Sequence, residues 1–83
     1  MSEEQHRLEV IELDLLLEAI YRAHGYDFRQ YARASLRRRF ALAMQELGEP
    51  TLTALQGRVL RDDTAFHTVL NRLSVTVTEM FRD

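Results

Sequence analysis

The chain has 83 residues, of which 46% are hydrophobic and 29% charged, and its formal net charge is −2. This length suits one small domain, and the absence of cysteine excludes a disulfide framework, a thiolate metal site and a cysteine nucleophile. The apolar runs are too short to span a membrane, and the acidic start does not look like a secretory signal. We therefore predict a cytoplasmic, soluble domain with no membrane insertion.

The first predicted helix covers about residues 8–24. Its apolar residues recur at three- and four-residue steps, as an amphipathic helix requires: Leu13, Leu16, Leu17, Ile20 and Tyr21. Gly25 follows where a left-handed cap is expected. Asp27 is the candidate cap of the next helix, with Gln30 three residues later completing a capping box.

The second predicted helix runs to about Leu47 and ends at Gly48. Its apolar face carries Leu36, Phe40, Ala43 and Leu47. The segment 29–45 contains five arginines and no acidic residue: Arg29, Arg33, Arg37, Arg38 and Arg39. Residues 1–28 are predominantly acidic, so this block can face either that acidic segment or an acidic partner outside the chain.

Two shorter helices are predicted next. Pro50 interrupts the helical pattern, and Thr51 is the expected N-cap of the third helix. Its apolar side consists of Leu52, Leu55, Val59 and Leu60. Asp62 or Asp63 is expected to cap the fourth helix, whose apolar residues follow an i, i+3, i+4, i+7 pattern: Phe66, Val69, Leu70 and Leu73.

The pattern changes after Leu73, where β-branched residues alternate with polar ones. This segment fits an edge strand, but a lone strand is unstable, and Thr76 or Thr78 fits equally well as the cap of a new helix. The apolar residues of the tail either complete the core or face another domain: Val75, Val77, Met80 and Phe81. We expect them to fold back or to form a symmetric homodimer through the C-terminal tail, and the interrupting threonines favour the dimer.

The arginine block has three interpretations. On a helical wheel, Arg29, Arg33 and Arg37 form a stripe on one side of the apolar face. Arg39 flanks the other side of that face, and Arg38 points away from it. The arginines are either a solvated face, with Arg39 paired to an acid of the first helix, or a docking surface for an acidic helix, since guanidinium groups bind carboxylates at two points. Nucleic-acid binding is disfavoured by the negative net charge and by the lack of interleaved aromatic residues.

Catalysis by this chain alone is not expected. The three histidines, His6, His24 and His67, have no spacing of three or four residues that would bring two of them onto one helix face as metal ligands. Ser35 and Ser74 have no adjacent histidine to activate them. The sequence predicts no catalytic residue and no metal site.

The order of these features resembles the N-terminal all-α domain of CheR-type chemotaxis methyltransferases. The resemblance rests on an amphipathic helix, Gly25-Tyr26-Asp27-Phe28, an arginine-bearing helix ending at Leu47-Gly48, two shorter helices, and the run from Leu73 to Asp83. In that family an Asn-x-Thr-x-Phe-Phe-Arg motif follows the helices. Here Thr78, Phe81 and Arg82 match it, while Thr76 replaces the asparagine and Met80 replaces the first phenylalanine.

The resemblance implies an all-α, four-helix domain over residues 1–73, with two longer helices followed by two shorter ones. Residues 74–83 would then begin the linker to a methyltransferase domain. The full-length protein would be an S-adenosylmethionine-dependent protein-glutamate O-methyltransferase in which this domain recognises a chemoreceptor. An alternative is a non-catalytic interaction module of the same type in a signalling pathway.

The resemblance also implies site residues. Substrate binding falls to Arg33, Arg37, Arg38 and Arg39, with the methylation region of a chemoreceptor, or another signalling protein, as partner. Cofactor contacts, made only together with the second domain, fall to Thr76, Thr78 and Arg82. No cofactor is expected on this chain by itself, because eleven tail residues supply at most one wall of a pocket.

Overall fold

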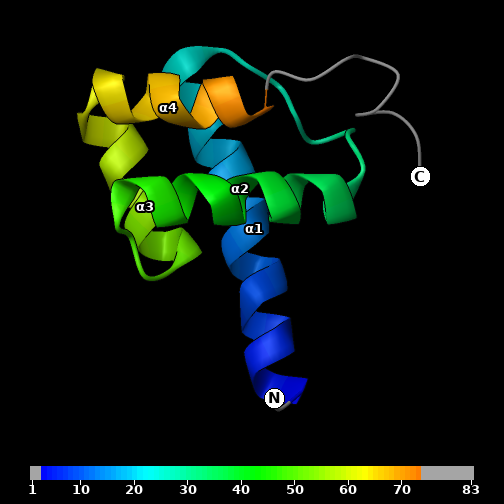
Figure 1. Cartoon of the computed structure of the whole chain (residues 1–83). Coiled ribbons are helices and arrows are strands. Elements are labelled where there is room, and N and C mark those ends of the chain that lie inside the picture. Colours follow the sequence, from blue (N-terminus) through cyan, green and yellow to red (C-terminus); the bar gives the residue numbers. More distant parts are fainter. Residues whose placement is uncertain (1–2, 74–83) are drawn as a thin grey trace.

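The computed structural model describes residues 3–73 as four α-helices (Figure 1). They are α1 (Glu3–His24), α2 (Arg33–Leu47), α3 (Leu52–Arg61) and α4 (Asp63–Leu73). The predicted all-α architecture, with two long helices followed by two short ones, is confirmed. The predicted tail features, including its homodimer contact, fall on 74–83 and lie outside the described residues.

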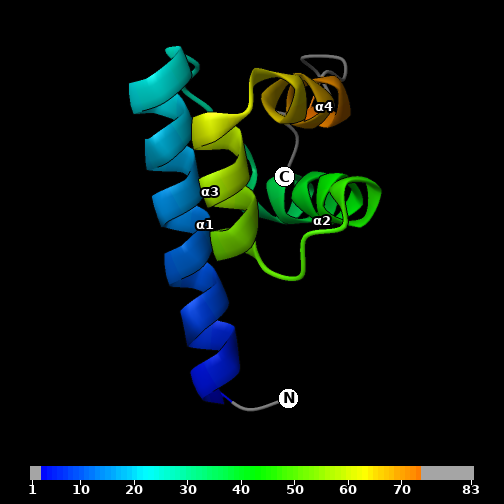
Figure 2. The ribbon, with the colours of Figure 1, turned by 90° about the vertical axis from the view of Figure 1, so that its left-hand side faces the viewer.

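The helices pack in two pairs, α1 with α3 and α2 with α4, and α3 also packs on α4 (Figure 2). The two long helices are therefore not each other's main partners. Their shared core lies between the pairs and contains Leu16, Ile20, Leu36, Phe40, Leu55, Val59 and Val69. The N-terminal half of α1 extends past the other helices in both views (Figures 1 and 2).

Most residues of the predicted apolar faces are buried, Leu47 and Leu70 are partly buried, and two predicted members are exposed. Tyr21 and Leu60 are exposed large hydrophobic residues. The guanidinium of Arg29 lies over the Tyr21 ring, 4.2 Å from its centroid. The ring thus makes a cation–π contact at the surface and is not part of the core. Helix α1 also begins at Glu3, five residues before the predicted start, and Glu3 and Glu4 suit the positive end of the helix dipole.

The predicted start of the second helix is wrong. Asp27 does not cap it; its Oδ1 accepts a hydrogen bond from the backbone N–H of Arg29 at 3.0 Å, which folds the chain into a local turn. The Arg29 guanidinium, and after it this backbone bond, hold the pKa of Asp27 below its usual value. Helix α2 therefore begins at Arg33, and Arg29 is not on the helix.

The other predicted caps at the later helix ends, from Gly25 onward, are confirmed. Gly25 and Gly48 have φ angles of 81° and 73°, in the left-handed region that favours glycine. The side chain of Thr51 accepts from the N–H of Ala54 at 3.0 Å. Asp62 accepts from the amides of Thr64 and Ala65, and the Ala65 bond is the main cause of its lowered pKa.

We expect Thr51→Ala to lower the free energy of unfolding by about 1 kcal/mol, because it removes the cap of α3. Thr51→Ser keeps a hydroxyl acceptor and should leave stability nearly unchanged. Chemical denaturation of the two variants checks this. Equal losses for alanine and serine would show that the Thr51 methyl group, and not its oxygen, stabilises this turn.

Candidate functional site

The arginine-bearing helix α2 is fixed from its inner side. Phe40 and Leu36 are fully buried in the core, and Glu46 binds Arg72 of α4 at 2.6 Å. Packing of the inner face and this ion pair hold α2 in place. Its outer face therefore has a fixed orientation relative to the other helices. That outer face carries Arg37 and Arg38, both of them exposed.

The structure divides the arginine block into two groups. Arg33 pairs with Asp14 of α1, and Arg29 binds Asp27 at 2.9 Å and Glu18 of α1 at 3.3 Å. The side chains of these two arginines thus pair with acids within the chain. Such exposed pairs are worth under ~1 kcal/mol each, so they orient the 25–32 loop more than they stabilise the domain.

The remaining three arginines lie where the helical wheel places them. Arg37 and Arg38 are exposed, and Arg39 is half-buried at the edge of the core. Within residues 3–73, the side chain of Arg37 makes no hydrogen bond or ion pair. Arg37 is therefore the best-placed cation of α2 for an external acidic group.

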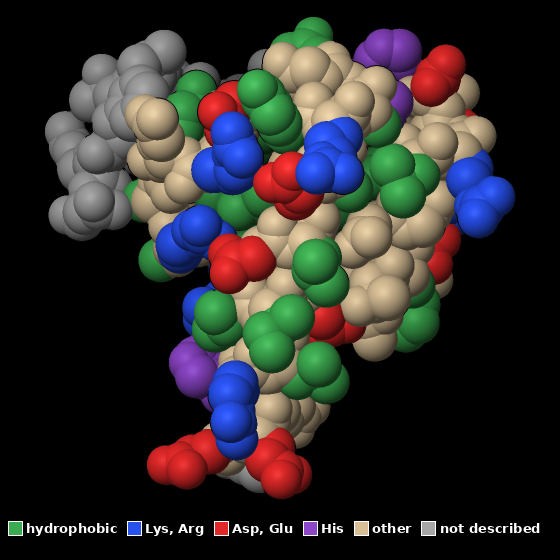
Figure 3. Space-filling view, turned by 180° about the vertical axis from the view of Figure 1, so that it is seen from behind, with side chains coloured by type: hydrophobic (Ala, Val, Ile, Leu, Met, Phe, Trp, Pro, Cys, Tyr) green, Lys and Arg blue, Asp and Glu red, His purple; other side chains and the backbone are tan. Residues whose placement is uncertain are grey.

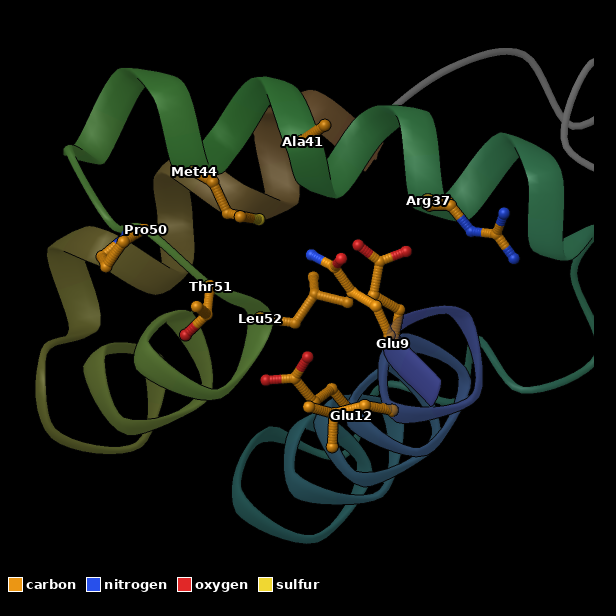
Figure 4. A pocket seen from close by; sticks show the side chains of 10 residues that line it. Glu9, Glu12, Arg37, Ala41, Met44, Pro50, Thr51 and Leu52 are labelled. Carbon is orange, nitrogen blue, oxygen red and sulfur yellow. The ribbon is translucent and has the colours of Figure 1, made fainter. Parts of the chain in front are cut away.

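A hollow of about 430 Å³ lies beside Arg37, in the angle between the projecting half of α1 and helix α2. Figure 4 shows Met44 and Leu52 turned toward its middle and Arg37 at one end. The Glu9 carboxylate points into it from α1. Its full lining is Gln5, Leu8, Glu9, Glu12, Arg37, Ala41, Met44, Pro50, Thr51 and Leu52.

The two acids of the hollow have different surroundings. Glu12 Oε2 accepts hydrogen bonds from the hydroxyl and the N–H of Thr53, the latter at 3.3 Å, so it ties α1 to the first turn of α3. Glu9 has no such bond in the described part of the chain. The hollow thus offers an apolar floor with one carboxylate on the α1 side and one guanidinium on the α2 side.

The loop that closes one end of the hollow is held by Arg58 of α3. Its guanidinium binds Glu49 at 2.6 Å and Asp62 at 3.4 Å, and it reaches the carbonyl oxygen of Leu47 at 3.5 Å. The two carboxylates, Glu49 first, raise the pKa of Arg58. Pro50 and Thr51 are consequently fixed as a wall of the hollow.

The arginines of α2 could be predicted as a candidate site from the sequence, but the hollow could not. Its lining comes from three separate segments, and each residue alone reads as an ordinary helix or turn position. The predicted cofactor-contacting residues Thr76, Thr78 and Arg82 lie outside the described residues. The predicted role of Arg33, Arg37, Arg38 and Arg39 in substrate binding stays a prediction.

The hollow does not suit S-adenosylmethionine. Its lining contains no aromatic ring to stack on an adenine and no glycine-rich loop to approach a nucleotide. Among residues 3–73, no group of three or more histidine or acidic side chains gathers to hold a metal ion.

Fold and site together define a four-helix domain whose second helix displays arginines beside an apolar hollow. Comparison with known proteins agrees: residues 11–74 match the family described as the CheR methyltransferase, all-alpha domain. The chain belongs to this family. The described residues include no helix long and apolar enough to cross a membrane.

A curated relative is similar over most of the chain. It is named "Putative methyltransferase Cher3", comes from Pseudomonas putida, and is 48% identical over 73 residues, which are 88% of this chain. The match covers 27% of the relative, so this chain corresponds to about a quarter of its length. No solved structure matches the chain.

Proposed function

We propose that this domain docks an acidic helical segment of a chemoreceptor or another signalling protein, as the substrate-recognition part of a CheR-like methyltransferase. The observation that carries the proposal is the exposed pair Arg37 and Arg38 on a helix fixed from behind, next to the hollow. Family membership supports the connection to methyltransfer. The reaction itself, S-adenosylmethionine-dependent methylation of glutamate side chains, belongs to a further domain.

The chemistry of the surface suits an amphipathic helix as ligand. Carboxylates on the ligand would meet Arg37 and Arg38 in two-point hydrogen bonds, which guanidinium groups form better than ammonium groups. An apolar side chain one turn away would enter the hollow over Met44 and Leu52. A basic residue on its far side would face Glu9.

Charge reversal on α2 tests this proposal. We expect Arg37→Glu/Arg38→Glu to weaken the binding of a fluorescent receptor-methylation peptide by about tenfold or more, since attraction becomes repulsion at two positions. Fluorescence anisotropy titrations at two salt concentrations measure the affinity and its electrostatic share.

Arg61→Glu is the matched control, because Arg61 is an exposed arginine at the end of α3 and lies outside the hollow's lining. Circular dichroism should show the helical content of all variants unchanged. If the double variant and the parent bind the peptide equally, α2 is not the docking surface.

A further inference from the structure

Helix α1 has a second apolar stripe that faces away from the core. Its members Leu8, Ile11 and Leu15 are 55%, 49% and 52% exposed. At 100° per residue they lie on one side of the helix, opposite the buried residues Leu16 and Ile20. Figure 3 shows hydrophobic side chains gathered along this face of the molecule, with charged ones around them.

The stripe continues in both directions with charged residues at heptad spacing. Positions 4, 8, 11, 15, 18 and 22 alternate steps of four and three, the spacing of a coiled-coil seam. They are occupied by Glu4, Leu8, Ile11, Leu15, Glu18 and Arg22. The apolar centre is thus followed by Glu4 at the N-terminal end and by Glu18 and then Arg22 at the C-terminal end.

We infer that this stripe binds the same stripe of a second copy of the chain, with the two α1 helices antiparallel. In this register Ile11 of each copy packs on Leu15 of the other, and Glu4 of each copy faces Arg22 of the other. Leu8 lies along the methylene groups of Glu18. This contact goes beyond the proposed docking function and uses a neighbouring face of α1, which shares only Leu8 with the lining of the hollow.

Charge decides the orientation. A parallel pairing would also join the apolar residues, but it would place Glu4 against Glu4, Glu18 against Glu18 and Arg22 against Arg22. Like charges in register are unfavourable, whereas the antiparallel arrangement gives opposite charges at both ends. Arg22 already binds Glu18 of its own helix at 2.8 Å, and its side chain is 78% exposed, so it remains accessible to a second acid.

The association should be weak and concentration-dependent, because stable interfaces bury roughly 800 Å² on each partner and this seam is one helix wide. Sedimentation equilibrium of the 83-residue chain from about 10 μM to 1 mM should show a monomer–dimer equilibrium. Ile11→Glu places a charge in the seam and should leave the chain monomeric over the whole range. The neighbouring Val10→Glu, off the stripe, should dimerise like the parent.

Charge exchange then tests the orientation. Glu4→Arg and Arg22→Glu should each weaken dimerisation, and the double variant should recover it, since the opposite charges are restored. The cysteine-free chain allows a second check: a mixture of Glu4→Cys and Arg22→Cys should oxidise mainly to the mixed disulfide.

A parent that stays monomeric at 1 mM overturns the inference and leaves the stripe to a different partner. Predominant Glu4→Cys homodisulfides would also overturn it, in favour of a parallel arrangement. Neither result bears on peptide docking, because Ile11, Glu4 and Arg22 are not part of the hollow or of the α2 surface.

Discussion

The substitution Phe40→Ala should remove most of the domain's stability at room temperature. Among residues 3–73, Phe40 has the largest fully buried side chain, and it joins α2 to the rest of the core. Removing a buried phenylalanine ring typically costs about 3–5 kcal/mol, and small domains have a total margin of roughly 5–15 kcal/mol. With 83 residues, this domain is expected near the lower end of that range.

Leu42→Ala is the matched control, because Leu42 lies two residues along the same helix and is 39% exposed. It should change stability by less than ~0.5 kcal/mol, as surface substitutions usually do. Urea denaturation followed by circular dichroism measures both variants. Comparable losses at the two positions would mean that α2 does not pack through the face described above.

Filling the hollow should block docking without unfolding the domain. Ala41 is exposed and lines the hollow from α2, so Ala41→Trp puts an indole where the ligand's apolar side chain is proposed to enter. Burial of one such side chain is worth roughly 1.5–3 kcal/mol, and its loss corresponds to a decrease in affinity of about 10- to 100-fold. Titration of the labelled receptor peptide measures the change.

Ala34→Trp provides the comparison. Ala34 is also exposed, precedes Ala41 by two helical turns on nearly the same side of α2, and does not line the hollow. This variant should bind the peptide like the parent. If Ala41→Trp also bound normally, the arginines would act without the hollow, and the ligand would lie along α2 alone.

The two sets of binding experiments separate the parts of the proposed surface. The Arg37→Glu/Arg38→Glu variant tests the electrostatic contribution, which salt weakens, and Ala41→Trp tests the apolar contribution, which salt affects little. A ligand that lost affinity only on charge reversal would be held mainly by its acidic residues. Loss in both variants would support a helix that spans α2 and the hollow together.

The four helices, most of their buried faces and most of their ends could be predicted from the amino-acid sequence. Apolar residues at three- and four-residue steps mark one side of a helix wherever that helix later packs. The caps at Gly25, Gly48, Thr51 and Asp62 depend on hydrogen bonds and dihedral angles within a few residues. Local interactions of this kind are encoded by neighbouring residues, so they could be predicted without the fold.

Which charged side chains pair within the chain, and which face outward, depends on the tertiary structure. Arg33 meets Asp14, and Arg29 meets Glu18, across sequence separations of 19 and 11 residues. The Asp27 turn, after which α2 begins at Arg33, is by contrast local: Asp27 accepts hydrogen bonds from the backbone N–H and the guanidinium of Arg29. The neighbouring sequence does not distinguish Arg29 and Arg33 from Arg37, because all three side chains carry the same charge and have similar neighbours along the chain.

The hollow and the outer stripe of α1 are likewise products of packing. Leu8, Met44 and Leu52 come together because α3 packs on α1 while α2 packs on α4, which leaves an angle between α1 and α2. Leu15 and Leu16 are adjacent and chemically identical, yet one is 52% exposed and the other fully buried. Helical periodicity places them on different sides of α1, but only the position of α3 determines which side is covered and which is left open to a partner.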